Sequence, residues 1–469
     1  MAGTYLEHTS KDLSGVYTLI VAALENVVMG ARGVVAYPFT ANWGPVNKLS
    51  IVLYGREFDD KFNPTGSTAV TASKISTHAF KGKPQKVLAY RMATLTAKKG
   101  AAALNDSGSQ MSLSLETLYE SDRAFVVSIK DSLNIAGGKL LELTENGNLL
   151  FRTESKTLDD LATKINYSDY IWVKAKGTNL PANVAGVAFT GGNNGSTVTV
   201  ADYSAFLDQL EADGTANAFS LDAVTDESVL TTVVTFVKRV RDEGFYVTFV
   251  RGGPLAWDTN LDAAGTAAFT CNHRGIVCVG NGVDGYSAAD MAIFIAARVA
   301  SVPLNRTLTD EVIDYVAVNK KLKPGERVTA KQNGVLVFVT DGKAVVIDEG
   351  INTLTAPHAD EVVEMGKIRI NNALDQIAHD LEVFGDEYKK ALSNTDEARK
   401  TYAATVEETY YKGLVTMQVL QPGASYRPDP EYHGKAAVFH PKVDEAFFIS
   451  EVWPVDSMEK IYQKLKLHF

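Results

Sequence analysis

Both ends of the chain carry an apolar pattern that is typical of a single short β-strand. Residues 15–21 are rich in β-branched and aromatic side chains, which favour extended backbone. Residues 461–469 alternate apolar and polar side chains up to the last position, which is the period of a half-buried strand. Neither stretch has a hairpin partner beside it, so each is predicted to pair with a sheet elsewhere.

Strands of this kind indicate assembly more than catalysis. A lone strand exposes backbone donors and acceptors that another strand must satisfy. When that strand belongs to a neighbouring subunit, two subunits share one sheet. We therefore expect two terminal arms, over 1–30 and 457–469, that add strands to other copies of the chain. The predicted strand-exchanging residues are Val16, Tyr17, Thr18, Leu19, Ile20, Leu465, Lys466, Leu467 and His468.

The first half of the chain predicts two segments of different character. Residues 31–93 favour a small α/β domain, with three strands and one helix near residues 73–80. Residues 94–177 change to short strands, two of which are joined by an Asn146-Gly147 turn that is typical of a β-hairpin. We interpret this second segment as an inserted β-sandwich, because its ends lie close in sequence to the flanking α/β parts.

Residues 178–350 alternate helix and strand, which predicts a mostly parallel sheet between helices. A helix over 227–243 is capped by Asp226 and stopped by Gly244. An apolar helix follows at 288–300. The segment closes with a hairpin around Asp341-Gly342.

Residues 351–456 predict a C-terminal α+β domain. We expect a strand at 362–370, a helix at 371–384 with apolar residues along one stripe, a second helix after Asn394, and a strand at 446–452. The predicted fold class is therefore multidomain, α/β and α+β, with strand arms at both ends.

Composition and charge narrow the classes of function. The 469 residues are 45% hydrophobic and 22% charged, which is typical of globular domains, and this length suggests about three of them. The net charge of −10 argues against nucleic-acid binding and provides no basic face for a membrane. The longest early apolar run, 16–24, is shorter than the ~20 residues that span a bilayer. The two cysteines, Cys271 and Cys278, flank an apolar strand and indicate buried thiols in a reducing cytoplasm.

Candidate chemistry is confined to glycine loops that follow predicted strands. Residues 251–253, 280–285 and 191–195 lie where an open α/β sheet binds ligands. None has the Gly-Lys-Ser/Thr of a phosphate-binding loop, and the loop at 280–285 lacks the acidic residue that follows a dinucleotide fingerprint. An α/β enzyme remains an alternative, with a site at Asp222, Arg251, Asn281 and Asp284.

Other candidate constellations carry less weight. The eight histidines are scattered, and no pair has the i, i+4 spacing of a helical zinc site. Cys271 and His273 share one face of a strand, but nothing identifies a third group to orient them. We expect no catalytic residue, no cofactor and no metal.

Several segments resemble a known family when they are taken in order. Ser14-Gly15-Val16-Tyr17, residues 32–36 and Trp43-Gly44-Pro45 resemble the opening of contractile tail sheath proteins of bacteriophages and phage-tail-like bacteriocins. The family form begins Pro-Gly-Val-Tyr, and Ser14 replaces that proline. Residues 349–354, 374–377 and 454–462 are similar to family segments near the C-terminus. The match runs along the whole chain, and the inserted sandwich is not diagnostic.

The resemblance implies a structural protein of a virion tail or tail-like particle, assembled in the cytoplasm of the bacterial host. Its partners would be other copies of itself, in stacked hexameric rings, with an inner tail tube protein, the baseplate and the tail terminator. It implies an inner α+β domain built from N- and C-terminal parts, and contraction that drives the tube through an envelope. Residues 22–30 and 452–457 are the candidate hinges of the arms.

A tube-facing surface is predicted on the helix 371–384 and the residues before it. Its members are Lys367, Arg369, Asp375, His379 and Glu382. Exposed charge pairs suit a contact that must break during contraction, because each contributes only ~0–1 kcal/mol. The alternative, weighted equally, is that these charges solvate an outer face. A different self-assembling shell or surface-layer subunit is the third interpretation of the whole chain.

Overall fold

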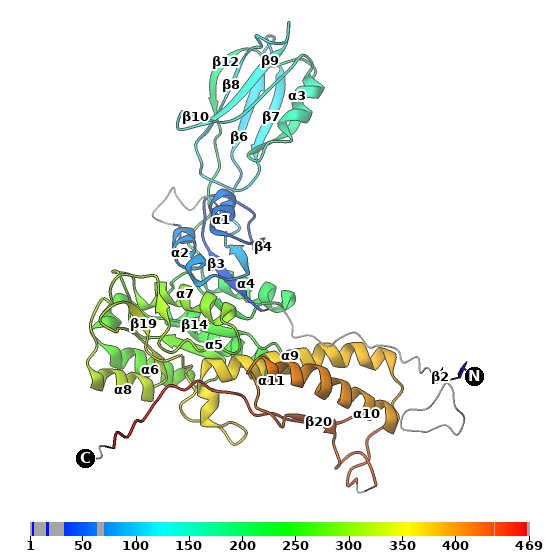
Figure 1. Cartoon of the computed structure of the whole chain (residues 1–469). Coiled ribbons are helices and arrows are strands. Elements are labelled where there is room, and N and C mark those ends of the chain that lie inside the picture. Colours follow the sequence, from blue (N-terminus) through cyan, green and yellow to red (C-terminus); the bar gives the residue numbers. More distant parts are fainter. Residues whose placement is uncertain (1, 4–15, 18–31, 63–69, 436, 467–469) are drawn as a thin grey trace. The chain divides into compact units, whose positions relative to one another are not determined.

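The computed structural model describes residues 32–62, 70–435 and 437–466, together with the backbone of residues 2–3 and 16–17. The chain divides into two compact units. The central unit comprises residues 31–375 and 456–469, and the C-terminal unit comprises residues 1–30 and 376–455. The mixed α/β fold class predicted from the sequence is confirmed (Figure 1).

A seven-stranded sheet forms the middle of the central unit. Its order is β17-β15-β14-β13-β3-β5-β4, and every neighbouring pair is parallel except β4 with β5. The strands are β3 (Val34–Phe39), β4 (Leu49–Val52), β5 (Lys86–Arg91), β13 (Ala218–Ser220), β14 (Thr248–Arg251), β15 (Ile276–Val279) and β17 (Val335–Leu336). The strands expected in a separate small domain at 31–93 thus share one sheet with those of 178–350, because β3 pairs with both β5 and β13.

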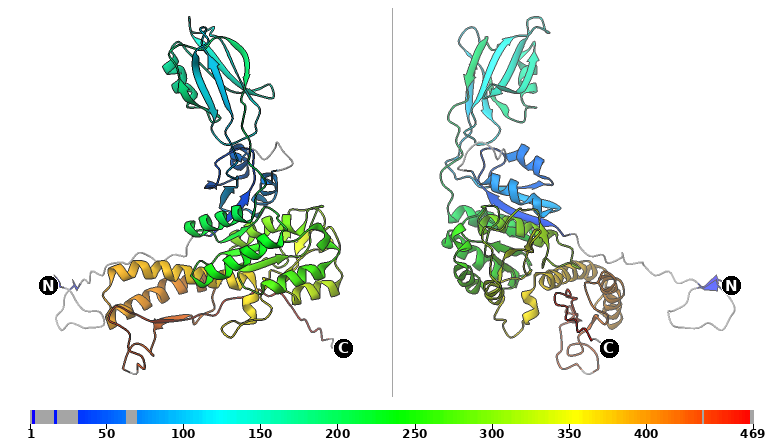
Figure 2. Two further views of the ribbon diagram at one scale, coloured as in Figure 1. Left: turned by 180° about the vertical axis from the view of Figure 1, so that it is seen from behind. Right: turned by 60° about the vertical axis from the view of Figure 1, so that its left-hand side comes forward.

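Helices cover both faces of this sheet (Figure 2). Successive residues of β3 point to opposite faces, so Val35 and Tyr37 lie in one core cluster and Ala36 lies in the other. The Ala36 face is covered by α4 (Val200–Asp213) and α5 (Glu227–Asp242). The other face is covered by α1 (Gly55–Phe62), α2 (Ala72–His78), α6 (Leu261–Cys271), α7 (Ala288–Ser301) and, at one margin, α8 (Pro324–Gln332).

The predicted apolar helix at 288–300 is α7, which is buried along almost its whole length. The predicted cap of α5 is also confirmed, since Asp226 accepts a hydrogen bond from the Ser228 N–H at 2.8 Å. Short 3-10 helices lie at Phe80–Gly82 and Leu255–Asp258. A small antiparallel sheet of order β16-β19-β18 contains the predicted hairpin, with β16 (Val312–Ile313), β18 (Phe338–Thr340) and β19 (Val345–Ile347).

The segment between β5 and α4 forms two facing antiparallel sheets, as predicted for a β-sandwich. One sheet has the order β10-β9-β8-β12 and the other β11-β7-β6. The elements are β6 (Ala101–Asn105), β7 (Met111–Thr117), β8 (Phe125–Asp131), β9 (Lys139–Glu145), β10 (Asn148–Ser155), α3 (Leu158–Ile165), β11 (Ile171–Lys176) and β12 (Val184–Ala188). Because β12 pairs with β8, the sandwich continues beyond residue 177, where the sequence suggested that it ends.

Two buried side chains join the sandwich to the rest of the central unit. Trp43 lies in the sandwich core, with its ring 5.4 Å from that of Phe125. Arg91 is fully buried and donates hydrogen bonds to the carbonyls of Gly44 and Glu120, each at 2.7 Å. Burial lowers the pKa of Arg91 to about 10, which still leaves the guanidinium charged near neutral pH.

The C-terminal unit contains helices and a two-stranded sheet. The helix α9 (Ile368–Ala391) begins in the central unit and continues into this one. It is followed by α10 (Asp396–Thr405), a π-helical turn (Val406–Tyr411), α11 (Lys412–Thr416), β20 (Ser425–Pro428) and β21 (Phe448–Glu451). Within the described residues, no helix combines the length and the apolar character needed to cross a bilayer.

The strand predicted at 362–370 is wrong. The structure has a 3-10 helix at Val363–Gly366, and α9 begins at Ile368. Buried residues at 370, 373 and 377 recur at intervals of three and four, which is the helical period. The β-branched residues at 368 and 370 suggested a strand, but only the single bridge between Ile351 and Lys367 forms there.

Candidate assembly site

The C-terminal unit carries a sheet of only two strands, β20 and β21. They run antiparallel, with Tyr426 opposite Ser450 and Pro428 opposite Phe448. Among the described residues no third strand pairs with either of them, so each outer edge presents backbone groups without a strand partner. A two-stranded sheet is marginal on its own in water, and an open edge is a template for a further strand.

An aromatic cluster supports one face of this sheet. The rings of Tyr426 and Phe448 stack with centroids 5.3 Å apart, and Tyr402 on α10 meets them edge-on at 5.6 and 5.2 Å. Tyr388 on α9 lies 4.6 Å from Tyr402. Such pairs contribute about 0.5–1.5 kcal/mol each beyond their buried area. The cluster therefore holds two short strands against α9 and α10.

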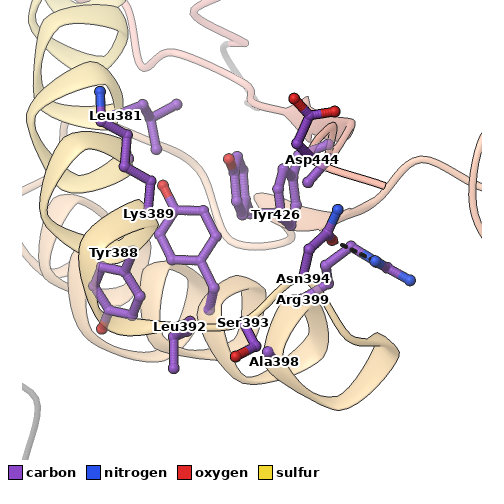
Figure 3. Close-up of a pocket in the computed structure, with 14 residues that line it drawn as sticks. Leu381, Tyr388, Lys389, Leu392, Ser393, Asn394, Ala398, Arg399, Tyr426 and Asp444 are labelled. Atoms are coloured by element: carbon purple, nitrogen blue, oxygen red, sulfur yellow. Dashed lines mark hydrogen bonds between the residues drawn. The ribbon is translucent and has the colours of Figure 1, made fainter. Parts of the chain in front are cut away.

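A pocket of about 420 Å³ lies beside this cluster. Figure 3 shows Tyr388 and Lys389 entering from α9, Arg399 from α10, and Tyr426 and Asp444 from the side of the sheet. Its remaining lining mixes apolar and polar side chains: Leu381, Gly385, Leu392, Ser393, Asn394, Ala398, Tyr402, Ala446 and Phe448. A lining with both apolar and charged side chains suits an amphipathic segment of chain.

The ionisable groups of this region lack the properties of an acid–base site. Burial raises the pKa of Tyr402 and Tyr426, and it raises the pKa of Tyr411 to about 12. These phenols stay protonated at neutral pH. Tyr410, whose pKa burial also raises, donates to the Asp380 carboxylate at 2.6 Å. The polar groups therefore stabilise the fold of the unit.

The sequence did not single out this aromatic cluster. The only signal was the density of tyrosines at 388, 402, 410, 411, 426 and 432, and density alone does not say which rings meet. Tyr388 and Tyr426 are 38 positions apart and come together only because α10 and β20 fold back along α9.

The predicted tube-facing residues do not form one exposed face. Asp375 is 4% exposed, and its carboxylate lies 2.6 Å from the Arg241 guanidinium. Arg369 is also buried, and Lys367 forms ion pairs inside the central unit. Asp375 and Arg369 therefore cannot belong to an open contact surface of the subunit. His379 and Glu382 are exposed, and for them the tube-facing role stays a prediction.

The predicted strand-exchanging residues are only partly described. The backbone of Val16 and Tyr17 forms a two-residue strand, β2 (Val16–Tyr17), paired with β1 (Ala2–Gly3). Thr18, Leu19, Ile20, Leu467 and His468 lie outside the described residues. Leu465 and Lys466 are exposed and not in a strand. Val16 and Tyr17 thus have a strand partner within their own chain, and the exchange of strands between subunits stays a prediction.

The C-terminal segment exposes several large apolar side chains close together in the sequence. Met458, Ile461, Tyr462 and Leu465 are 82%, 68%, 90% and 88% exposed. Four large apolar residues within eight positions are costly to leave exposed to water, and such clusters mark interaction surfaces.

The four residues of the alternative enzyme site each serve the fold. Asp222 is buried and accepts hydrogen bonds from the hydroxyls of Thr71 at 2.5 Å and Tyr203 at 2.8 Å. It lines a cavity of about 570 Å³, and burial raises its pKa. Arg251 is buried, and its guanidinium donates a hydrogen bond to Glu227 Oε1 at 2.8 Å. Both side chains are therefore engaged in contacts that stabilise the central unit.

The other two members of the alternative site form hydrogen bonds to the backbone of nearby segments. The Asn281 amide donates to the Phe338 carbonyl at 2.9 Å and accepts from the Phe338 N–H at 2.8 Å. Asp284 accepts from the N–H groups of Val316 and Ala317. No group of His, Cys, Asp or Glu side chains within the described part of the chain is arranged to hold a metal ion.

The predicted buried thiols are confirmed. Cys271 and Cys278 are free and buried, and burial raises the pKa of Cys278 to about 12 and that of Cys271 above its usual value. Burial likewise lowers the pKa of His273 to about 3, so the imidazole is neutral. A thiol that stays protonated is a poor nucleophile, which removes the pair as a catalytic candidate.

Comparison with known proteins agrees with a structural role. Residues 196–353 match the family model described as the phage tail sheath protein central domain. Two proteins of Bacillus subtilis (strain 168) are similar over nearly their whole length. The uncharacterized protein YqbK is 26% identical over 492 residues, with 98% of each chain covered. The phage-like element PBSX protein XkdK is 24% identical over 494 residues, with 99% of each chain covered.

Two solved structures share the fold. The sheath tail protein of Desulfitobacterium hafniense has a TM-score of 0.72 at 22% identity, covering 97% of this chain and 100% of that one. The helical sheath protein of the anti-feeding prophage in its contracted state has a TM-score of 0.56 at 10% identity, covering 97% and 99%. The family and these fold neighbours are structural proteins and not enzymes.

Proposed function

We propose that this chain is the subunit of a contractile sheath, because residues 196–353 match the family model of the phage tail sheath protein central domain and the fold is shared with a sheath tail protein. The subunits assemble as hexameric rings stacked around an inner tail tube, between a baseplate and a tail terminator. Contraction of the sheath drives the tube through the envelope of a target cell. The particle is a virion tail or a tail-like particle assembled in the bacterial cytoplasm.

The observation that carries this proposal is the two-stranded sheet of the C-terminal unit. Its outer edges have no further strand among the described residues, and a pocket of about 420 Å³ lies next to it. The terminal arms of neighbouring subunits supply the missing strands. An added strand of five residues contributes about 4–5 hydrogen bonds, each worth ~1 kcal/mol net.

Charge supports the same pairing. Residues 376–455 contain thirteen acidic and eight basic side chains, whereas residues 459–466 contain one acidic and three basic ones. An acidic unit therefore receives a basic arm, and the attraction aids encounter as well as binding. Repulsion between the acidic C-terminal units opposes association that does not involve the arms.

Contraction in this proposal needs no nucleotide. The extended sheath is a trapped state, and the contracted one buries more surface between subunits. An extra ~150 Å² of apolar surface per subunit corresponds to about 4 kcal/mol at ~25 cal/mol/Å². The arms contribute less energy than this, and their role is to keep subunits connected while the larger units move.

Electron microscopy of the purified chain tests the proposal. The full chain is expected to form hollow striated tubes with sixfold symmetry, and a variant lacking residues 1–21 is expected to form only monomers or isolated rings. A second variant lacking residues 460–469 tests the other arm in the same way. Discrete globular particles from the full chain and both variants would contradict assembly by strand exchange.

A further inference from the structure

The C-terminal segment returns to the central unit before the chain ends. The chain passes from the central to the C-terminal unit between Asp375 and Gln376, and it passes back between Val455 and Asp456. Residues 456–459 then bond to side chains of the central unit rather than running free. The candidate hinge at residues 452–457 therefore includes two residues, Asp456 and Ser457, that are bonded to the central unit.

Three side chains of the central unit hold this short segment. The Lys367 ammonium lies 2.5 Å from Asp456 Oδ2 and 2.7 Å from Glu459 Oε2. The Thr309 hydroxyl donates to Glu459 Oε1 at 3.0 Å. The charges are partly buried, with side-chain exposures of 27% for Lys367, 34% for Asp456 and 14% for Glu459.

Arg369 is the third of these side chains, and its Nη1 donates a hydrogen bond to Ser457 Oγ at 2.8 Å. Thr309 Oγ1 accepts from the Gly350 N–H at 3.0 Å, which directs its own proton toward Glu459. Burial alone lowers the pKa of Lys367, but the hydrogen bonds to Asp456 and Glu459 outweigh it and raise the pKa. The ammonium is therefore held in place as a cation between two carboxylates.

We propose that Lys367, Arg369 and Thr309 form a clamp that fixes the root of the C-terminal arm on the central unit. The clamp positions the arm, because the segment that leads to the exchanging strand then leaves the central unit from a fixed point at Lys460. The inference rests on the proposed function, because it assigns positioning residues to the arm that makes the inter-subunit strand. The hinge of this arm accordingly lies after residue 459.

The physical benefit is a shorter tether. With the clamp closed, the free chain begins at residue 460. With it open, the free chain begins near Val455, whose N–H is held by the Val419 carbonyl at 2.9 Å. Lengthening the tether to the middle of the strand about twofold lowers its effective concentration roughly threefold, because this concentration falls as about the −3/2 power of length. Without the clamp the arm also leaves the central unit in no fixed direction, which lowers the effective concentration of the strand further.

The test compares full-length variants in dilute, unassembled form and during assembly. K367M removes the ammonium while keeping much of the side-chain length, and the double variant D456N/E459Q removes the attraction from the other side. K321M is the matched control, since Lys321 is an exposed lysine of the same unit. K367R keeps the charge and is expected to behave as the original chain.

Hydrogen exchange in the dilute protein reports the clamp itself. Amides of residues 456–459 are expected to exchange at least tenfold faster in K367M and in D456N/E459Q, and unchanged in K321M and K367R. The protein concentration at which tubes first form is expected to rise roughly threefold in the same two variants. Unchanged exchange at 456–459 would refute the clamp, and faster exchange without a change in tube formation would refute its positioning role.

The two proposals fail in distinguishable ways. If the original chain forms no tubes at any concentration, the sheath proposal fails, and the exchange experiment alone decides whether the clamp exists. Thermal unfolding of each variant, compared with the original chain, shows whether the substitution has acted on the fold as a whole. A clamp variant with an unchanged transition and fast local exchange supports the inference.

Discussion

Replacing Asp375 by alanine tests whether this residue serves the fold of the subunit or a contact with a partner. Its carboxylate lies 2.6 Å from Arg241 Nη2 and 3.7 Å from Arg274 Nη1, and it accepts a hydrogen bond from the Asn371 amide at 2.9 Å. The Arg241 and Asp375 side chains are 2% and 4% exposed. Removing the carboxylate leaves a buried guanidinium without its counter-charge.

The expected cost follows from this burial. Breaking a buried pair by removing one partner costs about 3–5 kcal/mol, because the remaining charge stays desolvated. Replacing both partners at once by apolar residues of similar volume is expected to cost much less. The double variant R241M/D375L should therefore be more stable than D375A. At a slope of ~3 kcal/mol per M urea, D375A moves the unfolding midpoint down by about 1–1.7 M.

The assay uses the two cysteines as reporters of the central unit. Cys271 and Cys278 are 1% and 0% exposed, so a brief pulse of thiol reagent labels them only in molecules whose central unit has opened. Labelling is measured across a urea series for the original chain, for D375A and for the double variant. E364A is the control, since Glu364 is exposed and lies in the same unit.

The result that would refute this reasoning is a D375A midpoint within ~0.3 M of the original chain. A buried ion pair that costs nothing to break would mean that the guanidinium finds water or another partner. If the D375A subunit were as stable as the original but assembled poorly, Asp375 would belong to a contact surface after all.

Three further predictions concern other parts of the chain. His78 is buried and hydrogen-bonded through Nδ1 to the Tyr315 hydroxyl at 2.8 Å, and burial lowers its pKa to about 4. The unfolded state then binds the proton first, so stability falls by about 3 kcal/mol as the pH drops from 6.5 to 4; thiol labelling against pH should show a smaller fall in H78Q. W43A removes the indole from the sandwich core and is expected to cost about 3–5 kcal/mol, seen as faster exchange at residues 125–129, and unchanged exchange there would contradict the assigned packing. F448A removes a ring from the aromatic cluster and is expected to weaken tube formation in microscopy while leaving the thiol-labelling midpoint unchanged; a shifted midpoint would show that the effect is not confined to the C-terminal unit.

Local features of the chain were predictable because neighbouring residues determine them. The cap at Asp226, the apolar helix α7, the hairpin around Asp341-Gly342 and the buried thiols all follow from periodicity, turn chemistry or side-chain type within a few positions. The resemblance to tail sheath proteins could also be recognised from the sequence, since each motif is a short local pattern. The prediction of a strand at 362–370 failed because β-branched residues favour a strand locally, whereas tertiary packing can still bury them on one face of a helix, as in α9.

The tertiary structure decided everything that depends on residues far apart in the chain. It placed β3 between β5 and β13, so that segments separated by the inserted sandwich share one sheet. It paired Asp375 with Arg241 and Lys367 with Asp456 and Glu459, which turned predicted surface charges into internal ones. It also assembled the aromatic pocket from α9, α10 and the sheet. Sequence periodicity indicates which face of a helix or strand is apolar. It does not indicate which other element covers that face, because this depends on how the side chains of the whole folded chain pack together.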